Sequence, residues 1–371
     1  MLGSEVVVTW DVANPTGRPR RVELADELAP SLRAAPRRVV AHVPPRSTAV
    51  AATVLRPARR GSFVVEELVV RVRGPLGLVA RQARRRHLEE LRVLPVFRSR
   101  AEAELRIDRA RLLEVGQRSA AGRGGGTDFE QLRDYNVDDE FRRVDWSATA
   151  RAGRPIVRTY RAERNQQVLL LFDNGRIMAG RVADVPRVEH TMDAALALTA
   201  VATRLGDRTG LVAFDRRVRA VVAPASGRDQ LARVTEALFD LEPVLAESDY
   251  RGAFAEAVAR FRRRALLVVL TELAEASVTH TLLPALPVIT GRHRVLVAGV
   301  RDPQVERWAT EAPTNAAQAY RAAAARKALD ERRRTVARLQ AAGAVVVDAV
   351  PGRLGAALTD AYLAVKAAGS L

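Results

Sequence analysis

Two apolar segments of the chain end in carboxylates, and these two positions have the residue types that bind a hard cation. The run from Val168 ends at Asp173, and the run from Ala265 leads into Thr271 and Glu272. Magnesium takes oxygen ligands and is usually held by one or two carboxylates with water. In an open parallel sheet such strand ends lie at the edge where ligands bind. The structural alternative is that Asp173 caps the following turn and Glu272 is solvated.

The residues around Asp173 resemble the metal-ion-dependent adhesion site of von Willebrand factor A domains. That site combines Asp-x-Ser-x-Ser with a later Thr loop and a later Asp. Here only the first Asp matches: Gly175 and Ile177 replace the two Ser residues, and Glu272 replaces the later Asp. Each change removes or alters an oxygen ligand. We therefore predict no bound cofactor, with magnesium as the alternative, at a degenerate site made of Asp173, Gly175, Ser248, Asp249 and Glu272.

A second group of chemically active residues lies between 127 and 151, where acidic residues and arginines alternate among aromatic rings. Paired arginines and buried rings, Trp146 included, would clamp two domains together. If these residues are exposed instead, the same residue types would form a surface that binds a protein partner. The enzyme alternative is a divalent-metal-dependent hydrolase or nuclease using Asp128, Glu130, Asp138, Asp139 and Asp145. The clamp or partner-binding residues are Thr127, Asp128, Phe129, Glu130, Arg133, Tyr135, Asp139, Arg143, Asp145, Trp146 and Arg151.

No other motif supports catalysis, so we assign no catalytic residue and expect the protein not to be an enzyme. The chain has no cysteine, and its five histidines are scattered without a pair at metal-ligand spacing. The glycine cluster at 122–126 lacks the Lys of a nucleotide-binding loop.

The net charge of +17 is concentrated near the N-terminus, where residues 1–100 contain 19 arginines and 9 acidic residues. Such a surface suits an anionic membrane or the phosphates of nucleic acid. Aromatic residues make up only 5% of the chain, which leaves little for base stacking. A nucleic-acid partner is therefore the less favoured interpretation.

These residues are positioned by three segments of different pattern. Residues 1–97 alternate short β-branched runs with turns, which predicts a β-sandwich with strands at 5–10, 38–43, 47–55, 62–72 and 91–95. Between the last two strands, a basic stretch is expected to form an outer strand or loop at a solvated edge. Residues 98–164 form the charged segment. Residues 165–371 alternate apolar strands with amphipathic helices, which predicts a doubly wound α/β sheet.

The segment from Gly-Thr-Asp-Phe-Glu (126–130) to Asp-Trp-Ser-Ala-Thr-Ala-Arg (145–151) resembles the signature of the bacterial domain of unknown function 58 family. Further similarity lies in residues 56–63, 74–78, 206–215 and 248–254. The resemblance implies a β-rich N-terminal part, usually preceded by membrane helices, and a von Willebrand factor A-like C-terminal domain. Members commonly accompany a MoxR-type AAA+ ATPase.

Together these features predict a non-catalytic adaptor that binds a protein partner, a MoxR-type AAA+ ATPase by the resemblance. We expect it at the cytoplasmic face of the bacterial inner membrane, or in the cytoplasm if no membrane anchor exists. No segment of the sequence approaches the roughly 20 apolar residues needed to span a bilayer.

Overall fold

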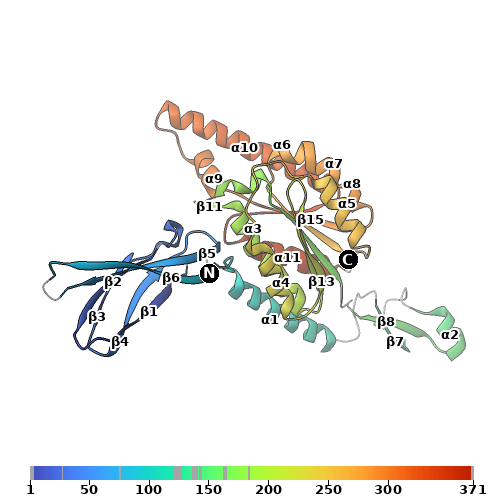
Figure 1. The fold of residues 1–371 in the computed structure, drawn as a ribbon. Coiled ribbons are helices and arrows are strands. Elements are labelled where there is room, and N and C mark those ends of the chain that lie inside the picture. Colours follow the sequence, from blue (N-terminus) through green and yellow to red (C-terminus); the bar gives the residue numbers. More distant parts are fainter. Residues whose placement is uncertain are drawn as a thin grey trace. The chain divides into compact units, whose positions relative to one another are not determined.

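The computed structural model describes residues 4–368, except 27, 75–76, 120–127, 136–140, 142–143, 162–164 and 183. The chain divides into two compact units, Met1–Val96 (unit 1) and Phe97–Leu371 (unit 2) (Figure 1). The predicted mixed α/β chain with a β-rich N-terminal part is confirmed. Among the described residues, no helix combines the length and the apolar character that crossing a membrane requires.

Unit 1 consists of two antiparallel sheets that pack around a shared apolar core. The smaller sheet pairs β1 (Val6–Asn14) with β4 (Ser47–Leu55). The larger has the order β3-β2-β5-β6, from β3 (Arg38–Val43), β2 (Arg20–Asp26), β5 (Gly61–Arg73) and β6 (Ala80–Val93), and the short helix η1 (Pro30–Leu32) follows β2. Leu24 and Val39 of the larger sheet meet Ala51 and Trp10 of the smaller one. Alternation of buried and exposed residues along strands such as β3 produces this one-sided core.

Two strands of unit 1 differ from the sequence prediction. Strand β2 is missing from the prediction because charged residues surround its two buried apolar side chains, Val22 and Leu24. Strand β6 begins at Ala80 rather than 91. It contains Arg81 and Arg84–Arg86, and as the outer strand of its sheet it is largely exposed. The interpretation of this basic stretch as a solvated edge is therefore confirmed.

Unit 2 is built on a six-stranded sheet in the order β13-β12-β9-β14-β15-β16. Its strands are β9 (Gln167–Asp173), β12 (Arg208–Phe214), β13 (Val218–Ala225), β14 (Leu266–Leu270), β15 (Arg294–Val300) and β16 (Val345–Ala349). All neighbouring pairs are parallel except β12 with β13. Strand order reverses between β9 and β14, which places a topological switch point at their carboxyl ends.

Helices cover both faces of this sheet (Figure 1). One face packs against α3 (Arg187–Arg204), α4 (Asp229–Phe239) and α11 (Leu354–Ala367), and α1 (Arg100–Ser119) packs on α3 and α11. The other packs against α5 (Tyr250–Arg260), α10 (Ala316–Ala341) and the consecutive helical segments α6 (Glu275–Ser277), η4 (Val278–Leu282), α7 (Leu283–Ala285) and α8 (Pro287–Thr290). Helix α9 (Pro303–Thr310) packs on α10. The short elements η3 (Arg176–Ala179), β10 (Arg181–Val182) and β11 (Val185–Pro186) lie between β9 and α3.

The charged segment 98–164 contributes to unit 2 through helix α1. Ala103 and Ile107, one helical turn apart, are buried in the core against α3 and α11. The guanidinium of Arg106 binds both carboxylate oxygens of Asp360 at 2.7 and 3.0 Å. Further along, β7 (Asp128–Asp134) pairs with β8 (Ile156–Arg161), and α2 (Trp146–Ala152) packs on β8.

Candidate functional site

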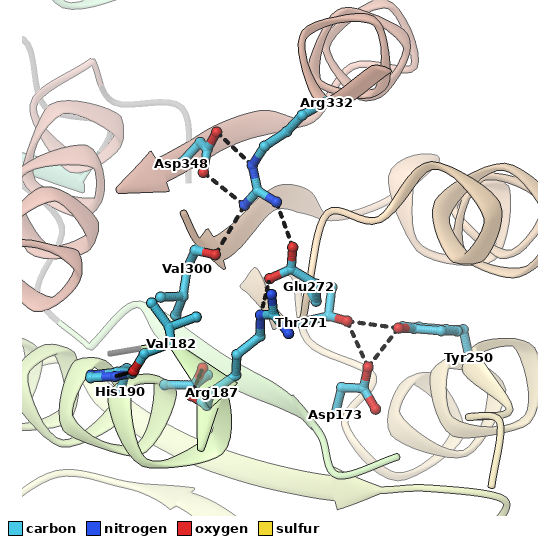
Figure 2. Close-up of polar contacts among 11 residues, drawn as sticks. Asp173, Val182, Arg187, His190, Tyr250, Thr271, Glu272, Val300, Arg332 and Asp348 are labelled. Carbon is cyan, nitrogen blue, oxygen red and sulfur yellow. Dashed lines mark hydrogen bonds and ion pairs between the residues drawn. The ribbon is translucent and has the colours of Figure 1, made fainter. Parts of the chain in front are cut away.

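Asp173 lies at the carboxyl end of β9, beside the switch point, and its side chain is fully buried. Its Oδ1 accepts hydrogen bonds from the Gly175 backbone N–H at 2.9 Å and from the Ser248 hydroxyl at 2.5 Å. Its Oδ2 lies 2.6 Å from the hydroxyls of Tyr250 and Thr271 (Figure 2). A carboxylate offers about four acceptor positions. Neutral donors of the protein therefore occupy all of them.

Tyr250 supplies one of the buried donors. It is the first residue of α5, and its hydroxyl also lies 2.7 Å from that of Thr271. Burial, and next the negative charge of Asp173, raise the pKa of Tyr250 well above its usual value. The phenol is therefore held in its neutral, hydrogen-bond-donating form.

Gly175 is required because the Ser248 hydroxyl lies against its backbone. A Cβ at position 175 would stand 2.1 Å from the Ser248 Oγ and 3.0 Å from the Ala246 carbonyl oxygen. The serine that the adhesion-site motif has at this position would not fit while Ser248 is in place. Because position 175 has no serine hydroxyl, Ser248 from the later loop supplies a hydroxyl to Asp173 instead.

Asp249 is exposed, and its side chain caps α5 by accepting a hydrogen bond from the Gly252 N–H at 2.9 Å. The carboxylate oxygen that accepts this bond has a structural role at the helix N-terminus. Asp249 and Ser248 are both predicted members of the degenerate metal site, and of these two the described structure brings Ser248 into hydrogen-bond contact with Asp173.

The alternative in which Glu272 is solvated is wrong, because Glu272 is buried between two arginines. Its Oε1 lies 2.5 Å from an Nη of Arg332, and its Oε2 lies 3.1 Å from the Nε of Arg187 (Figure 2). Arg332 also donates to both oxygens of Asp348, at 2.9 and 3.0 Å, and to the Val300 carbonyl at 3.2 Å. This network joins α3, α10 and the ends of β14, β15 and β16.

The pKa of Arg332 shows that its partners outweigh the cost of burial. Burial alone would lower this pKa, but the hydrogen bonds and charges of Asp348 and Glu272 raise it above its usual value. The guanidinium is therefore a permanent cation that neutralises both acids. Sequence reasoning missed Arg187, Arg332, Asp348 and the role of Tyr250, because nothing in their local sequence indicates which strand end they contact.

The carboxyl edge of the sheet is thus a closed polar network. Within the described ranges, no three His, Asp or Glu side chains gather in an arrangement that could hold a metal ion. The Asp173 oxygens are occupied by neutral donors. The Oε1 of Glu272 is bonded by Arg332, whereas its Oε2 forms an ion pair with Arg187 without a hydrogen bond in the described part of the chain. The acceptor positions of Asp173 are therefore filled by the protein, and Glu272 is neutralised by two arginines.

The signature segment presents two large exposed rings. Trp146 is 62% exposed and Phe141 is 68% exposed, and their rings meet edge to face with centroids 5.4 Å apart. Asp145 caps α2 by accepting from the Ser147 and Ala148 N–H groups, each at 3.0 Å. The expectation of a buried Trp146 is therefore wrong. Helix α2 has only seven residues, and Ala148 rather than Trp146 provides its buried contact.

The other predicted residues of this segment are distributed as follows. Tyr135 is half-buried and its backbone N–H binds the Pro155 carbonyl at 2.9 Å, and Arg151 is exposed with its Nε 3.2 Å from the Ser147 carbonyl. Asp128, Phe129, Glu130 and Arg133 belong to strand β7. Thr127, Asp138, Asp139 and Arg143 lie outside the described residues. Of the acidic residues proposed for two-metal chemistry, Asp145 is engaged as a helix cap.

Comparison with known proteins identifies relatives by sequence similarity and solved structures by structural similarity. Uncharacterised proteins of Mycobacterium tuberculosis and Mycobacterium bovis are 26% identical over 185 residues, which is 49% of this chain and 57% of each relative. Among solved structures, BatB, a conserved hypothetical protein from Bacteroides thetaiotaomicron, matches 56% of this chain and 100% of its own with 14% identity and a TM-score of 0.37. An aerotolerance-related membrane protein from Bacteroides fragilis matches 36% of this chain and 67% of its own with 15% identity and a TM-score of 0.28.

The family comparison covers a larger part of the chain. The family model described as "Protein of unknown function DUF58" matches residues 131–337. This range includes most of the signature segment, five of the six strands of the large sheet and most of α10, and it ends before β16. This is more than half of the 371 residues. The chain belongs to the DUF58 family.

Proposed function

We propose that this protein is a non-catalytic protein-interaction module whose unit 2 is a von Willebrand factor A-type domain. We further propose that it binds its partner through Phe141 and Trp146. The observation that carries the proposal is the pair of exposed rings in the signature segment. Large aromatic side chains dominate binding energy at protein interfaces, and an exposed aromatic pair has apolar area that a partner can bury.

The position of Trp146 is fixed by local structure, which favours a prepared binding surface. Asp145 binds the first N–H groups of α2, so the helix begins at Trp146. Val144 is buried and bridges to Val157 of β8. The backbone is thus fixed on both sides of Trp146. Fixing the side chains before binding reduces the entropy lost on association.

The Asp173 network supports an interaction that needs no bridging cation. In the adhesion site that this region resembles, magnesium is held by oxygen ligands at the carboxyl edge of the sheet. Here the corresponding Asp173 is satisfied by Gly175, Ser248, Tyr250 and Thr271. We therefore include no cofactor in the proposed function.

We propose a MoxR-type AAA+ ATPase as the partner and the cytoplasmic face of the bacterial inner membrane as the location. The partner rests on the family resemblance of the signature and its flanking motifs. The membrane location rests on that resemblance and on the excess of arginine in unit 1. Arginines near an anionic lipid surface contribute about 1 kcal/mol each to attraction.

The test is the affinity of the purified full chain for a purified MoxR-type ATPase from the same organism, measured by biolayer interferometry. The double variant Phe141→Ala/Trp146→Ala is expected to bind at least about 30-fold more weakly, since a hot-spot side chain contributes about 2 kcal/mol or more. The matched control is Leu245→Ala/Tyr320→Ala, which removes two side chains that are 79% and 80% exposed. Unchanged affinity in the aromatic variant, or an equal loss in the control, would contradict the proposed surface. Absence of binding by the wild type would contradict the proposed partner.

A further inference from the structure

One end of unit 1 collects three chain connections. The register of its sheets places the β1–β2, β3–β4 and β5–β6 connections at this end. The end of β1 pairs with the start of β4, and the start of β2 pairs with the ends of β3 and β5, the latter of which pairs with the start of β6. Asn14, buried at the end of β1, ties two of the connections together by donating to the carbonyls of Arg18, Val43 and Pro44 at 2.8, 3.2 and 2.9 Å. We call the described residues 15–21, 42–47, 70–74 and 77–82 the loop end of unit 1.

The loop end is basic and contains no acidic residue. Its seven arginines are exposed or half-buried: Arg18, Arg20, Arg21, Arg46, Arg71, Arg73 and Arg81. Of these, Arg73 is paired with Glu23 at 2.7 Å. Three more arginines, Arg84–Arg86, follow on β6, whereas the acids of this hairpin lie at its other end, at residues 66, 67, 89 and 90. Charge is therefore separated along the β5–β6 hairpin.

Two aliphatic side chains lie at the tip of the same hairpin. Leu78 is 84% exposed and Val79 is 72% exposed. The turn is closed by the Gly74 N–H, which binds the Val79 carbonyl at 2.8 Å, and by Gly77, which has a φ of +71° and binds the Gly74 carbonyl at 2.9 Å. The turn therefore holds Leu78 and Val79 at the end of the β5–β6 hairpin, next to arginines on both strands.

This combination is suited to a lipid surface. Aliphatic groups gain from burial at the boundary of headgroups and acyl chains, while arginines bind lipid phosphates. Nucleic acid would use the arginines but would gain little from exposed aliphatic side chains, since its bases are bound by stacking and hydrogen bonds. We infer that the loop end of unit 1 contacts an anionic membrane, with Leu78 and Val79 inserted among the headgroups. The inference rests on the membrane location proposed above.

The experiment uses the absence of cysteine from the chain, because a single introduced cysteine can then be labelled alone. Full-length Leu78→Cys carrying an environment-sensitive nitrobenzoxadiazole label is mixed with vesicles of phosphatidylcholine, with or without phosphatidylglycerol. The matched control is Leu88→Cys on β6, at a side chain that is 80% exposed. Leu88 lies eight residues beyond the start of β6, about 26 Å away at ~3.3 Å per residue. Interfacial insertion reaches only about 5–10 Å.

We expect a blue shift of the label at 78, and none at 88, only with the anionic vesicles and at low salt. Arg46→Gln/Arg81→Gln should weaken vesicle binding on the order of 20-fold, from about fivefold for each charge. Arg33→Gln/Arg38→Gln, at the opposite end of unit 1, should weaken it less than twofold.

Sedimentation of the wild-type chain with the same vesicles separates the ways in which the inference can fail. If the chain sediments but the label at 78 does not shift, the hairpin contact is wrong and the membrane location stands. If the chain does not sediment, both are wrong, while partner binding through Phe141 and Trp146 is tested independently. A shift with duplex DNA or polyglutamate and none with vesicles would overturn the inference in favour of a soluble polyanion.

Discussion

Replacing Tyr250 with phenylalanine removes one hydroxyl from the Asp173 network and leaves the ring in place. The ring packs edge to face on Phe214 and Phe254, with centroids 5.4 and 6.0 Å away, so the variant creates no large cavity. The loss is a buried hydrogen bond of 2.6 Å to a carboxylate. Such a bond contributes about 1.5–3 kcal/mol, more than a neutral one. We expect the free energy of unfolding to fall by about 2 kcal/mol.

Thermal unfolding of the full chain at pH 7.5, followed by calorimetry, measures this loss. For a unit of this size, about 2 kcal/mol corresponds to a fall in Tm of about 4–8 °C. The matched control is Tyr320→Phe, which removes a hydroxyl from an 80% exposed tyrosine of α10. The control variant should have the same Tm as the wild type. A shift below about 1 °C in Tyr250→Phe, or the same shift in both variants, would refute the view that this hydroxyl stabilises Asp173.

Three further predictions concern the same edge of the sheet. Because the pKa of Tyr250 is raised in the folded state, the unfolded phenol ionises first, near pH ~10. The extra stability of the wild type over Tyr250→Phe should therefore be full below pH ~10 and decline above it, which urea midpoints at pH 8 and 11 would show. Arg332→Met leaves Glu272 and Asp348 buried without their shared cation and should cost about 3–5 kcal/mol in urea unfolding, whereas Arg333→Met, at a side chain 78% exposed, should cost little. Gly175→Ser should cost about 1–3 kcal/mol through its clash with Ser248, and the added Ser248→Gly change should recover much of that loss; a single variant as stable as the wild type would contradict the close approach.

The central strands of unit 2 could be predicted because parallel strands buried on both faces have continuous apolar sequences. Val168–Phe172 and Leu266–Leu270 are such runs, and both are almost completely buried. Strand β6 has no such signal, since its exposed residues at the sheet edge are mostly charged. Helix α9 was missed although Asp302 caps it and Pro303 begins it, a pair that is typical of a helix start. Its eight residues show too few apolar positions to reveal a periodicity.

The candidate site was predictable only where it lies at the end of a strand. Asp173, Thr271 and Glu272 follow apolar runs directly, so the topology of the sheet brings them to one edge. Arg187 and Arg332 reach Glu272 from the beginning of one helix and the middle of another. The contacts of these two arginines with Glu272 depend on how α3 and α10 pack on the sheet, and no local sequence pattern predicts that packing. The exposure of Trp146 likewise depends on the small size of α2 rather than on the residue type.

The central claim is that the protein itself satisfies Asp173, so that the module works without a bound cation. Calorimetric titration of the full chain with magnesium chloride at pH 7.5 tests this claim most directly. The closed network of Gly175, Ser248, Tyr250 and Thr271 around Asp173 predicts no saturable heat below millimolar magnesium. Saturable binding at micromolar magnesium, lost in both Asp173→Ala and Ser248→Ala, would contradict it.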